Sequence, residues 1–345
     1  MCRLPSLRVS HFESFLGVQG RQEPTGESDE NKIPSRDTIL TSKGVVTYAE
    51  VEENVFRPNN YKIVEPSFPL PKLDFISRPS CSQIFGEWLN ITRKPAPVRP
   101  PKEIEESEKD AFLLNGYSML YEYEYSNEKG SSKLAVWDQI DKMMRTPRTL
   151  VRAYGRAGVT VYYALRDYPV RKMTGFVIGS QKPWIEVQAL RSGASKVYTV
   201  EYRETKIIGA TNIEYIHPID FAERWKENLE KFDFAITFSS IEHSGLGRYG
   251  DPLDPIGDLR EVQKVMCLLK KGGLLYVGVP RGLDGVLYNL HRIYGRMRLA
   301  MIMAGYEWVA MYRGNSPYPQ YPRREDYEEG NEAKFKQDLH VLRKL

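Results

Sequence analysis

The sequence predicts an α/β fold: a mostly parallel sheet with helices on both of its faces. Three observations lead to this prediction. From residue 171 onward, short apolar segments alternate with segments of helical periodicity, which is typical of βαβ units. Several of these helical segments begin near a proline or end at a glycine. One apolar segment, 232–238, breaks off into a loop rich in Ser, Glu, His and Gly, as strands do at ligand sites.

The expected elements follow one another in order after residue 171. Strands are expected at 173–178, 196–200, 212–216, 232–238, 274–279 and 306–312, with a last short strand at 339–342. Helices are expected at 183–192, 220–231, 255–269 and 286–304. Pro183 and Pro255 stand in the first turns of two of these helices, and Gly193 and Gly305 follow the ends of two.

The first half of the chain lacks this regularity. Residues 1–60 are polar and 61–101 are rich in proline, so we expect 1–100 to be disordered or extended, with one short helix near 83–89. Residues 101–170 are expected to form a helical lead-in, because apolar residues between 132 and 166 have roughly helical spacing. The remaining residues, 171–345, form the predicted α/β domain.

Composition excludes several classes of protein. A net charge of +4 over 345 residues gives no basic surface, so no nucleic-acid partner is expected. No window reaches the ~18 apolar residues of a membrane span, and residues 1–20 lack a signal-peptide pattern; we therefore expect a cytoplasmic protein. Cys2, Cys81 and Cys267 stand far apart, which argues against a disulfide framework and a zinc site. Cys267 is expected in the core, and the oligomeric state does not follow from the sequence.

The ends of the first two predicted strands carry candidate ligand contacts. Gly179 precedes a helix, where glycine lets a ligand approach the backbone and free N–H groups can bind an anionic group. Glu201 ends the second strand, where an acid accepts hydrogen bonds from ribose hydroxyls in dinucleotide-binding folds. Each residue also has an ordinary structural interpretation, the glycine as a turn and the glutamate as a solvated carboxylate.

The loop after 232–238 holds the best acid–base pair of the chain, Glu242 next to His243. Imidazole titrates near neutral pH and a carboxylate can orient it. The alternative is a histidine that holds the loop through backbone hydrogen bonds. These two residues with Asp251, Asp254 and Asp258 could also be interpreted as a metal cluster. Two of the aspartates precede proline, as in ordinary turns, so no metal is predicted.

The C-terminal half resembles a known enzyme superfamily. The motif LKKGGLLYVGVP, the helix after it and AGYEWVAMYRG resemble the end of class I S-adenosylmethionine-dependent methyltransferases. Their fifth strand is commonly introduced by LKPGG, and their sixth follows a helix that ends in AGF or AGY. The longer phrases VIGSQKPWIEVQAL and SSIEHSGLGRYGDPLDPIGDL resemble a Caenorhabditis-type domain-of-unknown-function family with a methyltransferase-like core. Over about 174–345, the resemblance implies a Rossmann-like class I methyltransferase sheet.

The resemblance also implies S-adenosylmethionine as cofactor, bound at the ends of the first, second and fourth strands. The implied cofactor contacts are Gly179, Ser180, Gln181, Glu201, Asp220, Ser239 and Ser240. The first three would line the methionine end, Glu201 would hold the ribose, and Ser239 to Glu242 would border the sulfonium and the substrate. Asp220 could face the adenine amino group or equally cap the following helix. The methyl acceptor, a small molecule or a protein, is not specified.

The loop after the first strand departs from the methyltransferase pattern. In place of GxGxG the chain has Gly179-Ser180-Gln181-Lys182-Pro183-Trp184, so two glycines are missing and Pro183 removes a backbone donor. Three functions stay open: a methyltransferase in which His243 or Glu242 removes an acceptor proton, a non-catalytic binding or scaffold relative, and a nucleotide- or sugar-handling enzyme on the same fold. An indole of Trp184 that filled the hollow would preserve the architecture but not the enzyme.

Overall fold

The computed structural model describes residues 37–94, 101–122, 133–249, 251–330 and 336–345. Residues 36–345 form one compact unit, which includes segments from all three expected divisions, 1–100, 101–170 and 171–345. The disorder expected for residues 1–36, the proline-rich 95–100 and Cys2 lie outside the described residues.

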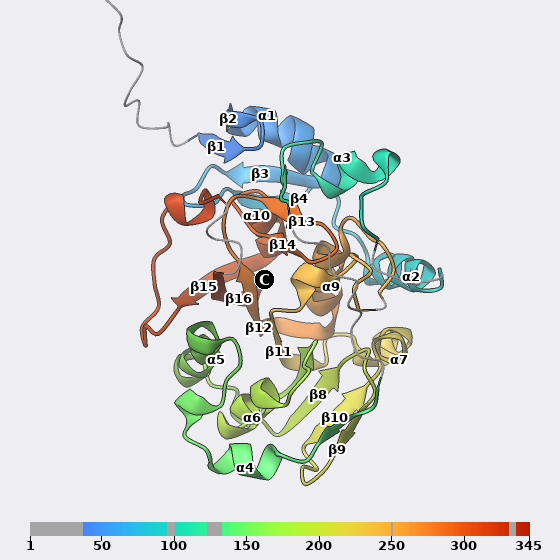
Figure 1. Ribbon diagram of the computed structural model, residues 1–345, viewed down its shortest axis with the longest axis vertical. Helices are drawn as coiled ribbons and strands as arrows, with labels where there is room; N and C mark the ends of the chain where they lie inside the picture. Colours follow the sequence, from blue (N-terminus) through green and yellow to red (C-terminus); the bar gives the residue numbers. More distant parts are fainter. Residues whose placement is uncertain (1–36, 95–100, 123–132, 250, 331–335) are drawn as a thin grey trace, which may run out of the picture. The chain divides into compact units, whose positions relative to one another are not determined.

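A seven-stranded sheet forms the centre of this unit. Its strand order is β10-β8-β7-β11-β12-β16-β15, and the labelled strands succeed one another in this order in Figure 1. The strands up to β12 are parallel, and β16 is antiparallel to both of its neighbours. This confirms the predicted Rossmann-like class I methyltransferase sheet. The strand bounds are β7 Thr174–Ile178, β8 Lys196–Val200, β10 Ile213–Ile216, β11 Phe232–Phe238, β12 Leu269–Pro280, β15 Tyr306–Arg313 and β16 Gln337–Lys344.

Helices cover both faces of the sheet, as predicted. Successive side chains of a strand point to opposite faces, and here they enter two separate apolar clusters. Phe176 lies in the cluster that contains α7, α9 and α10, whereas Val177 lies in the cluster that contains α5 and α6. The helix bounds are α4 Ile140–Arg145, α5 Gly155–Asp167, α6 Trp184–Arg191, α7 Pro218–Glu223, α8 Trp225–Asn228, α9 Gly257–Leu268 and α10 Arg298–Met303.

The sheet has a topological switch point at β7. This strand pairs in parallel with β8 on one side and with β11 on the other. Ile178 is in register with both Val200 and Thr237, so the carboxyl ends of the three strands meet at one edge. Open α/β sheets bind ligands outside the strand ends at such a point.

The segment 37–94 differs from the expectation of a disordered or extended region, except that the short helix expected near 83–89 is present within α2. It forms two short strand pairs and the helix α2, and Ile39, Phe56 and Phe85 are buried in the same cluster as α9. Isolated two-stranded pairs are marginal in water, so their packing on the α/β unit determines this structure, and sequence periodicity does not reveal it. The elements are β1 Thr38–Thr41, β2 Gly44–Thr47, α1 Tyr48–Val51, β3 Tyr61–Glu65, β4 Lys72–Phe75 and α2 Cys81–Thr92.

The helix predicted over 286–304 is wrong in its first half. Here the chain forms the hairpin β13 (Gly285–Leu287) and β14 (His291–Ile293), and β13 also pairs with β5 (Met119–Leu120). Asn289, between the two strands, has a φ of 56°, a left-handed conformation that interrupts a right-handed helix. The helix expected over 220–231 is also shorter, because it divides into α7 and α8. The remaining short elements are α3 Lys109–Phe112, β6 Ala135–Trp137 and β9 Thr205–Ile207.

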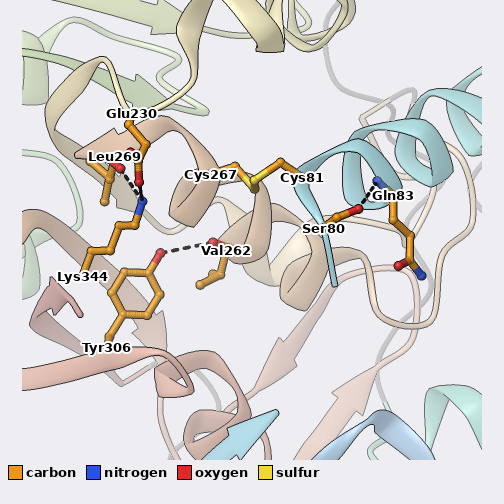
Figure 2. Close-up of a disulfide and its surroundings, with 9 residues drawn as sticks. All are labelled: Ser80, Cys81, Gln83, Glu230, Val262, Cys267, Leu269, Tyr306 and Lys344. Carbon is orange, nitrogen blue, oxygen red and sulfur yellow. Dashed lines mark hydrogen bonds and ion pairs between the residues drawn. A yellow bond between two sulfur atoms is a disulfide. The ribbon is translucent and has the colours of Figure 1, made fainter. Parts of the chain in front are cut away.

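Cys81 and Cys267 form a disulfide, which corrects the expectation drawn from their spacing. The bond joins the first residue of α2 to the last turn of α9 (Figure 2), and the two Cα atoms are 5.8 Å apart. Cys267 lies in the core, as expected, with 5% of its surface exposed. The two cysteines are 186 positions apart in the sequence, and nothing in the sequence indicates that α2 lies against α9.

Candidate functional site

A pocket lies at the carboxyl ends of β7, β8 and β11, at the switch point of the sheet. One side, which we call the strand-tip wall, is made by Ile178, Gly179, Gln181, Val200, Glu201, Ser239 and Ser240. A second side, the α2–α9 wall, is made by Phe85, Trp88, Ile91, Glu261, Lys264, Val265 and Leu268. The lining is completed by residues from α7 and from the loop after β11, and by Tyr154, Phe176 and Tyr202.

The structure brings most of the predicted site residues to this one pocket. The predicted residues that line it are Gly179, Gln181, Glu201, Ser239, Ser240 and His243. Ser180, Asp220 and Glu242 do not line it. The first two strands contribute through the residues that follow their ends, and β11 contributes through its two serines, so the predicted convergence of the three strand ends is present.

Gly179 and Ser240 are in close contact across the strand tips. Gly179 has a φ of +77°, and a Cβ at this position would lie 1.8 Å from the Ser240 Oγ atom. Glycine is therefore required both for its conformation and for the close approach of Ser240. The serine side chain fills the space that any other residue at 179 would need.

Ser239 has a strained backbone and a shared hydroxyl. Its φ is 53°, a conformation that costs energy in a residue other than glycine and that is common at functional sites. Its hydroxyl accepts a hydrogen bond of 2.8 Å from Gln337 Nε2 and interacts with the Tyr154 phenol and the Glu242 carboxyl. Tyr154 has a φ of 54° just before α5 and also lines the pocket. Sequence patterns did not indicate this tyrosine.

Glu201 presents a partly desolvated carboxyl group to the pocket. Burial raises its pKa, and the backbone N–H groups of Arg203 and Tyr202 oppose this shift. The Arg203 N–H donates to Glu201 Oε1 at 3.2 Å. A carboxylate with little access to water is stabilised by any further donor, so a ligand hydroxyl beside Glu201 would gain a charge-assisted hydrogen bond.

Ser180 faces the interior rather than the pocket. Its hydroxyl donates to Glu186 Oε2 at 3.1 Å, and Thr199 donates to Glu186 Oε1 at 2.9 Å. Glu186 is fully buried in the first turn of α6, and burial raises its pKa to about 7. An internal carboxyl group therefore lies near the start of α6, where free N–H groups were expected to bind an anionic group of the ligand.

Asp220 is exposed in the first turn of α7. The helix cap predicted at this residue is instead His217, whose Nδ1 accepts a hydrogen bond of 3.3 Å from the Ile219 N–H. The same helix contributes Pro218, Phe221 and Ala222 to the pocket. An adenine contact at Asp220 stays a prediction.

His243 is held by the backbone rather than by Glu242. Its Nδ1 donates to the Leu290 carbonyl oxygen, and its Nε2 lies 3.9 Å from Glu242 Oε1, too far for a hydrogen bond. Burial lowers the pKa of His243 to about 3, and His291 and Arg248 act in the same direction. The imidazole is therefore neutral near pH 7, with Nε2 free to accept a hydrogen bond.

Glu242 lies behind the pocket as an uncharged acid. It is 1% exposed, and burial raises its pKa to about 8. Its Oε2 has no hydrogen-bond partner among the described residues. A protonated carboxyl group cannot orient the imidazole as an anion, so the contacts follow the alternative in which His243 holds the loop. A role in proton transfer stays a prediction for both residues.

The aspartates that could be interpreted as metal ligands have other partners. Asp251 accepts hydrogen bonds from the N–H groups of Gly245, Gly247 and Tyr249, and this fixes the glycine-rich loop. Asp254 pairs with Arg260, and Asp258 with Arg298. Across the described ranges no group of three or more potential ligand side chains could hold a metal ion.

Trp184 does not fill the pocket. Its indole is 5% exposed and packs edge-on against Phe238, with ring centroids 5.6 Å apart. It belongs to the apolar cluster of α5 and α6, whereas Phe176 of the pocket belongs to the opposite cluster. The bulky residue of the altered loop therefore contributes to the core.

The α2–α9 wall is the part of the site that sequence reasoning missed. Trp88 Nε1 donates to Glu261 Oε1 at 2.9 Å. The Lys264 ammonium lies 3.5 Å from the centre of the Trp88 ring and 2.7 Å from Glu261 Oε1. A single tryptophan in a segment without long periodicity carries no signal that it approaches a strand end some hundred residues later.

None of the described helices is long and apolar enough to cross a membrane.

Comparisons with known proteins give one family and several distant folds. The family described as "Caenorhabditis protein of unknown function, DUF268" matches residues 172–345. No curated protein matches the chain.

Among solved structures, one similar fold is the 1,6-didemethyltoxoflavin-N1-methyltransferase of Burkholderia thailandensis, with bound S-adenosylhomocysteine. It is 16% identical over 54% of this chain and 76% of that chain, with a TM-score of 0.38. The N-methyltransferase NodS of Bradyrhizobium japonicum is 9% identical over 60% and 97%, with a TM-score of 0.36. The [4+2]-cyclase SpnF is 11% identical over 63% and 99%, also with a TM-score of 0.36. Similarity at this level does not decide a reaction.

Proposed function

The chain belongs to the Caenorhabditis family of unknown function, DUF268, and we propose that it is an S-adenosylmethionine-dependent methyltransferase. The observation that carries this proposal is the convergence of Gly179, Glu201 and Ser239 on one pocket. These residues follow the ends of three adjacent parallel strands at a switch point, where α/β sheets bind nucleotide-like ligands. The sequence motifs of the fifth and sixth strands point to the same class of enzyme.

The residues present fit an adenosyl ligand at its ribose. Glu201 is a partly desolvated carboxyl in the pocket that would gain from a hydroxyl donor, and Gly179 and Gln181 also line the pocket. The fit is poorer at the cofactor carboxylate, because Ser180 is bonded to the internal Glu186. S-adenosylmethionine would supply the methyl group, and the chain would supply position and exclusion of water.

We assign His243 an orienting role in this proposal. A histidine with a pKa of about 3 is a weak base, since effective bases titrate near the working pH. Its neutral Nε2 can accept a hydrogen bond from a hydroxyl or amine of the methyl acceptor. The acceptor would then lie beside His243 and Ser240, both of which line the pocket.

A non-catalytic adenosyl-binding protein is the second candidate. Two observations favour it. The internal carboxyl of Glu186 lies near the start of α6, and of the Glu242–His243 pair only His243, whose pKa is lowered to about 3, lines the pocket. Both candidates bind the ligand. Only the first produces S-adenosylhomocysteine when supplied with an acceptor.

Calorimetric titration of the full chain with S-adenosylmethionine and S-adenosylhomocysteine tests both candidates. We expect binding, and about tenfold weaker binding for Glu201→Gln, which is about 1.4 kcal/mol. Glu204→Gln is the matched control, because Glu204 is an exposed acid that does not line the pocket. A ligand at a hundred times its dissociation constant adds about 2.7 kcal/mol of stability. No thermal shift at millimolar concentration of either ligand would end the proposal.

The same titration examines the third function that the fold allows. Binding of a nucleotide sugar or NAD, without binding of S-adenosylhomocysteine, would replace the methyltransferase by a nucleotide- or sugar-handling enzyme. Release of S-adenosylhomocysteine in the presence of candidate small-molecule or protein acceptors would identify the acceptor class.

A further inference from the structure

Helix α2 brings a segment from outside the family match into the pocket. The match begins at residue 172, whereas α2 spans Cys81–Thr92. Ser80 caps the helix by accepting a hydrogen bond of 3.2 Å from the Gln83 N–H, as Figure 2 shows. Its buried face carries Phe85 and Trp88, and both side chains line the pocket.

Helix α2 is attached to α9 by a disulfide, by polar side-chain contacts and by three apolar side chains, Ile84, Phe85 and Trp88, which are buried in the same cluster as α9. The disulfide lies at the start of α2, and Cys267 directly precedes Leu268, which lines the pocket. Further along, Trp88 bonds to Glu261 and lies under Lys264. The Glu87 carboxylate pairs with Arg260. Among the described residues, the disulfide is therefore the one covalent link between α2 and α9.

The contacts of the buried polar groups in the α2–α9 wall depend on the position of α2. Burial lowers the pKa of Lys264, and Glu261 opposes this shift. If α2 moved away, Lys264 would lose the aromatic face that it contacts, and Glu261 would lose the indole N–H. Both residues line the pocket, so a displacement of α2 would change the shape and the charge of the ligand site together.

We propose that α2 is a ligand-positioning wall of the pocket and that the Cys81–Cys267 disulfide holds it closed. Reduction to two thiols releases the start of α2, and the pocket loses the surface made by Phe85 and Trp88. This inference rests on the proposed function, because adenosyl-ligand affinity is its readout. It assigns to α2 a role that the family match does not include.

The chemistry needs a dithiol reductant. A thiolate of the dithiol attacks one sulfur of the protein disulfide, the bond between the two cysteines breaks, and the other cysteine leaves as a thiolate that takes up a proton. The second thiolate of the reductant then attacks its own sulfur in the mixed disulfide, which closes the disulfide of the reductant and releases the remaining cysteine as a thiol. Cys81 is partly exposed and Cys267 is buried, so attack occurs at the Cys81 sulfur. Disulfides persist in oxidising compartments and are rare in the cytosol. The expected cytoplasmic location, which stays a prediction, would therefore favour the open state.

The test compares S-adenosylhomocysteine affinity of the oxidised and the dithiothreitol-reduced full chain by calorimetry. A Cys2→Ser background leaves only the two paired cysteines. We expect about tenfold weaker binding after reduction and in Cys81→Ser, and no effect of dithiothreitol on Cys81→Ser. Trp88→Ala should weaken binding to a similar degree. Asn90→Ala, on the exposed side of α2, should leave it unchanged.

Amide hydrogen exchange provides a readout that needs no ligand. Reduction should accelerate exchange in residues 81–92 at least tenfold and leave β7 and β11 unchanged, which also shows that the reduced chain remains folded. Equal affinity in the two redox states, or equal exchange in α2, would overturn the inference while the proposed function stands. Absence of binding in the oxidised chain would instead overturn the function, and this inference with it.

Discussion

The two walls of the pocket are built in different ways. The strand-tip wall lies at the ends of three strands that are paired in continuous register, so its residues are fixed by the sheet. The α2–α9 wall joins segments 186 positions apart through one disulfide, polar side-chain contacts and apolar packing, without strand pairing. A helix that is held at the side of a sheet by side-chain contacts can open locally at a lower free energy than the strands in the core of the sheet. The pocket thus combines a rigid half with a half that can be released.

Among the predicted changes, Cys81→Ser should have the largest effect on the attachment of α2, and with it on the stability of the chain. Removal of a disulfide that closes a long loop typically lowers the free energy of unfolding by about 2–4 kcal/mol. Urea denaturation of the oxidised chain, the reduced chain and the variant measures it. Cys2→Ser is the control. Equal midpoints for the variant and the oxidised parent would show that non-covalent contacts alone hold α2.

Gly179→Ala, in the strand-tip wall, should lower the free energy of unfolding by a similar amount. The new Cβ would lie 1.8 Å from Ser240 Oγ at a φ of +77°, and such crowding with a left-handed alanine costs about 2–4 kcal/mol. Ser240→Gly in the same chain should restore part of the loss in chemical denaturation, because it removes the clashing atoms. An alanine at 179 that leaves stability unchanged would contradict the tight contact.

Glu242→Gln should change how stability depends on pH. The folded pKa of Glu242 is raised to about 8, so in the unfolded chain the acid ionises at lower pH than in the folded chain. Its contribution to stability is therefore complete below about pH 4 and is lost as pH rises towards 8. Glutamine should remove this loss, so the variant should gain stability relative to the parent as pH rises from 5 to 8.

Measurements of unfolding free energy between pH 4 and pH 9 check this prediction. His243 works in the opposite direction. Its folded pKa is lowered to about 3, so its contribution is lost as pH falls from about 6.5 towards 3. A Glu242→Gln profile parallel to that of the parent from pH 5 to pH 8 would show that Glu242 is ionised in the folded chain.

Trp88→Phe should have the smallest effect of the series. The substitution keeps an aromatic ring near Lys264 but removes the hydrogen bond to Glu261, which is worth about 1 kcal/mol. Faster amide exchange confined to α2 would locate the loss in the α2–α9 wall. An equal rise of amide exchange in β7 would mean that the α2–α9 wall does not open independently of the strand-tip wall.

The contrast between the walls also explains what the sequence could predict. Short apolar segments that alternate with helical segments located β7, β8 and β11 within a residue of their ends, and with them Gly179, Glu201 and Ser239. The predictions failed where distant contacts decide: the strands β1–β4, the hairpin at Asn289 and the pairing of Cys81 with Cys267. Local patterns also could not show that Ser180 turns inward to Glu186, because this depends on Thr199 of the neighbouring strand.

The chemistry at His243 could be predicted only in part. The sequence placed the imidazole at the end of a central strand, and the structure places it in the pocket. Its protonation depends on the Leu290 carbonyl and on His291 and Arg248. Two of these lie on the hairpin that was predicted as helix. The hairpin that was predicted as a helix is therefore also the reason why the protonation state of His243 could not be predicted from the sequence.

A crystal structure of the oxidised chain with S-adenosylhomocysteine tests the central claim most directly. The account predicts the ligand at the ends of β7, β8 and β11, with a ribose hydroxyl within hydrogen-bonding distance of Glu201 and with α2 closed against α9. A pocket that stays empty at saturating ligand, or a ligand bound away from these three strand ends, would contradict it.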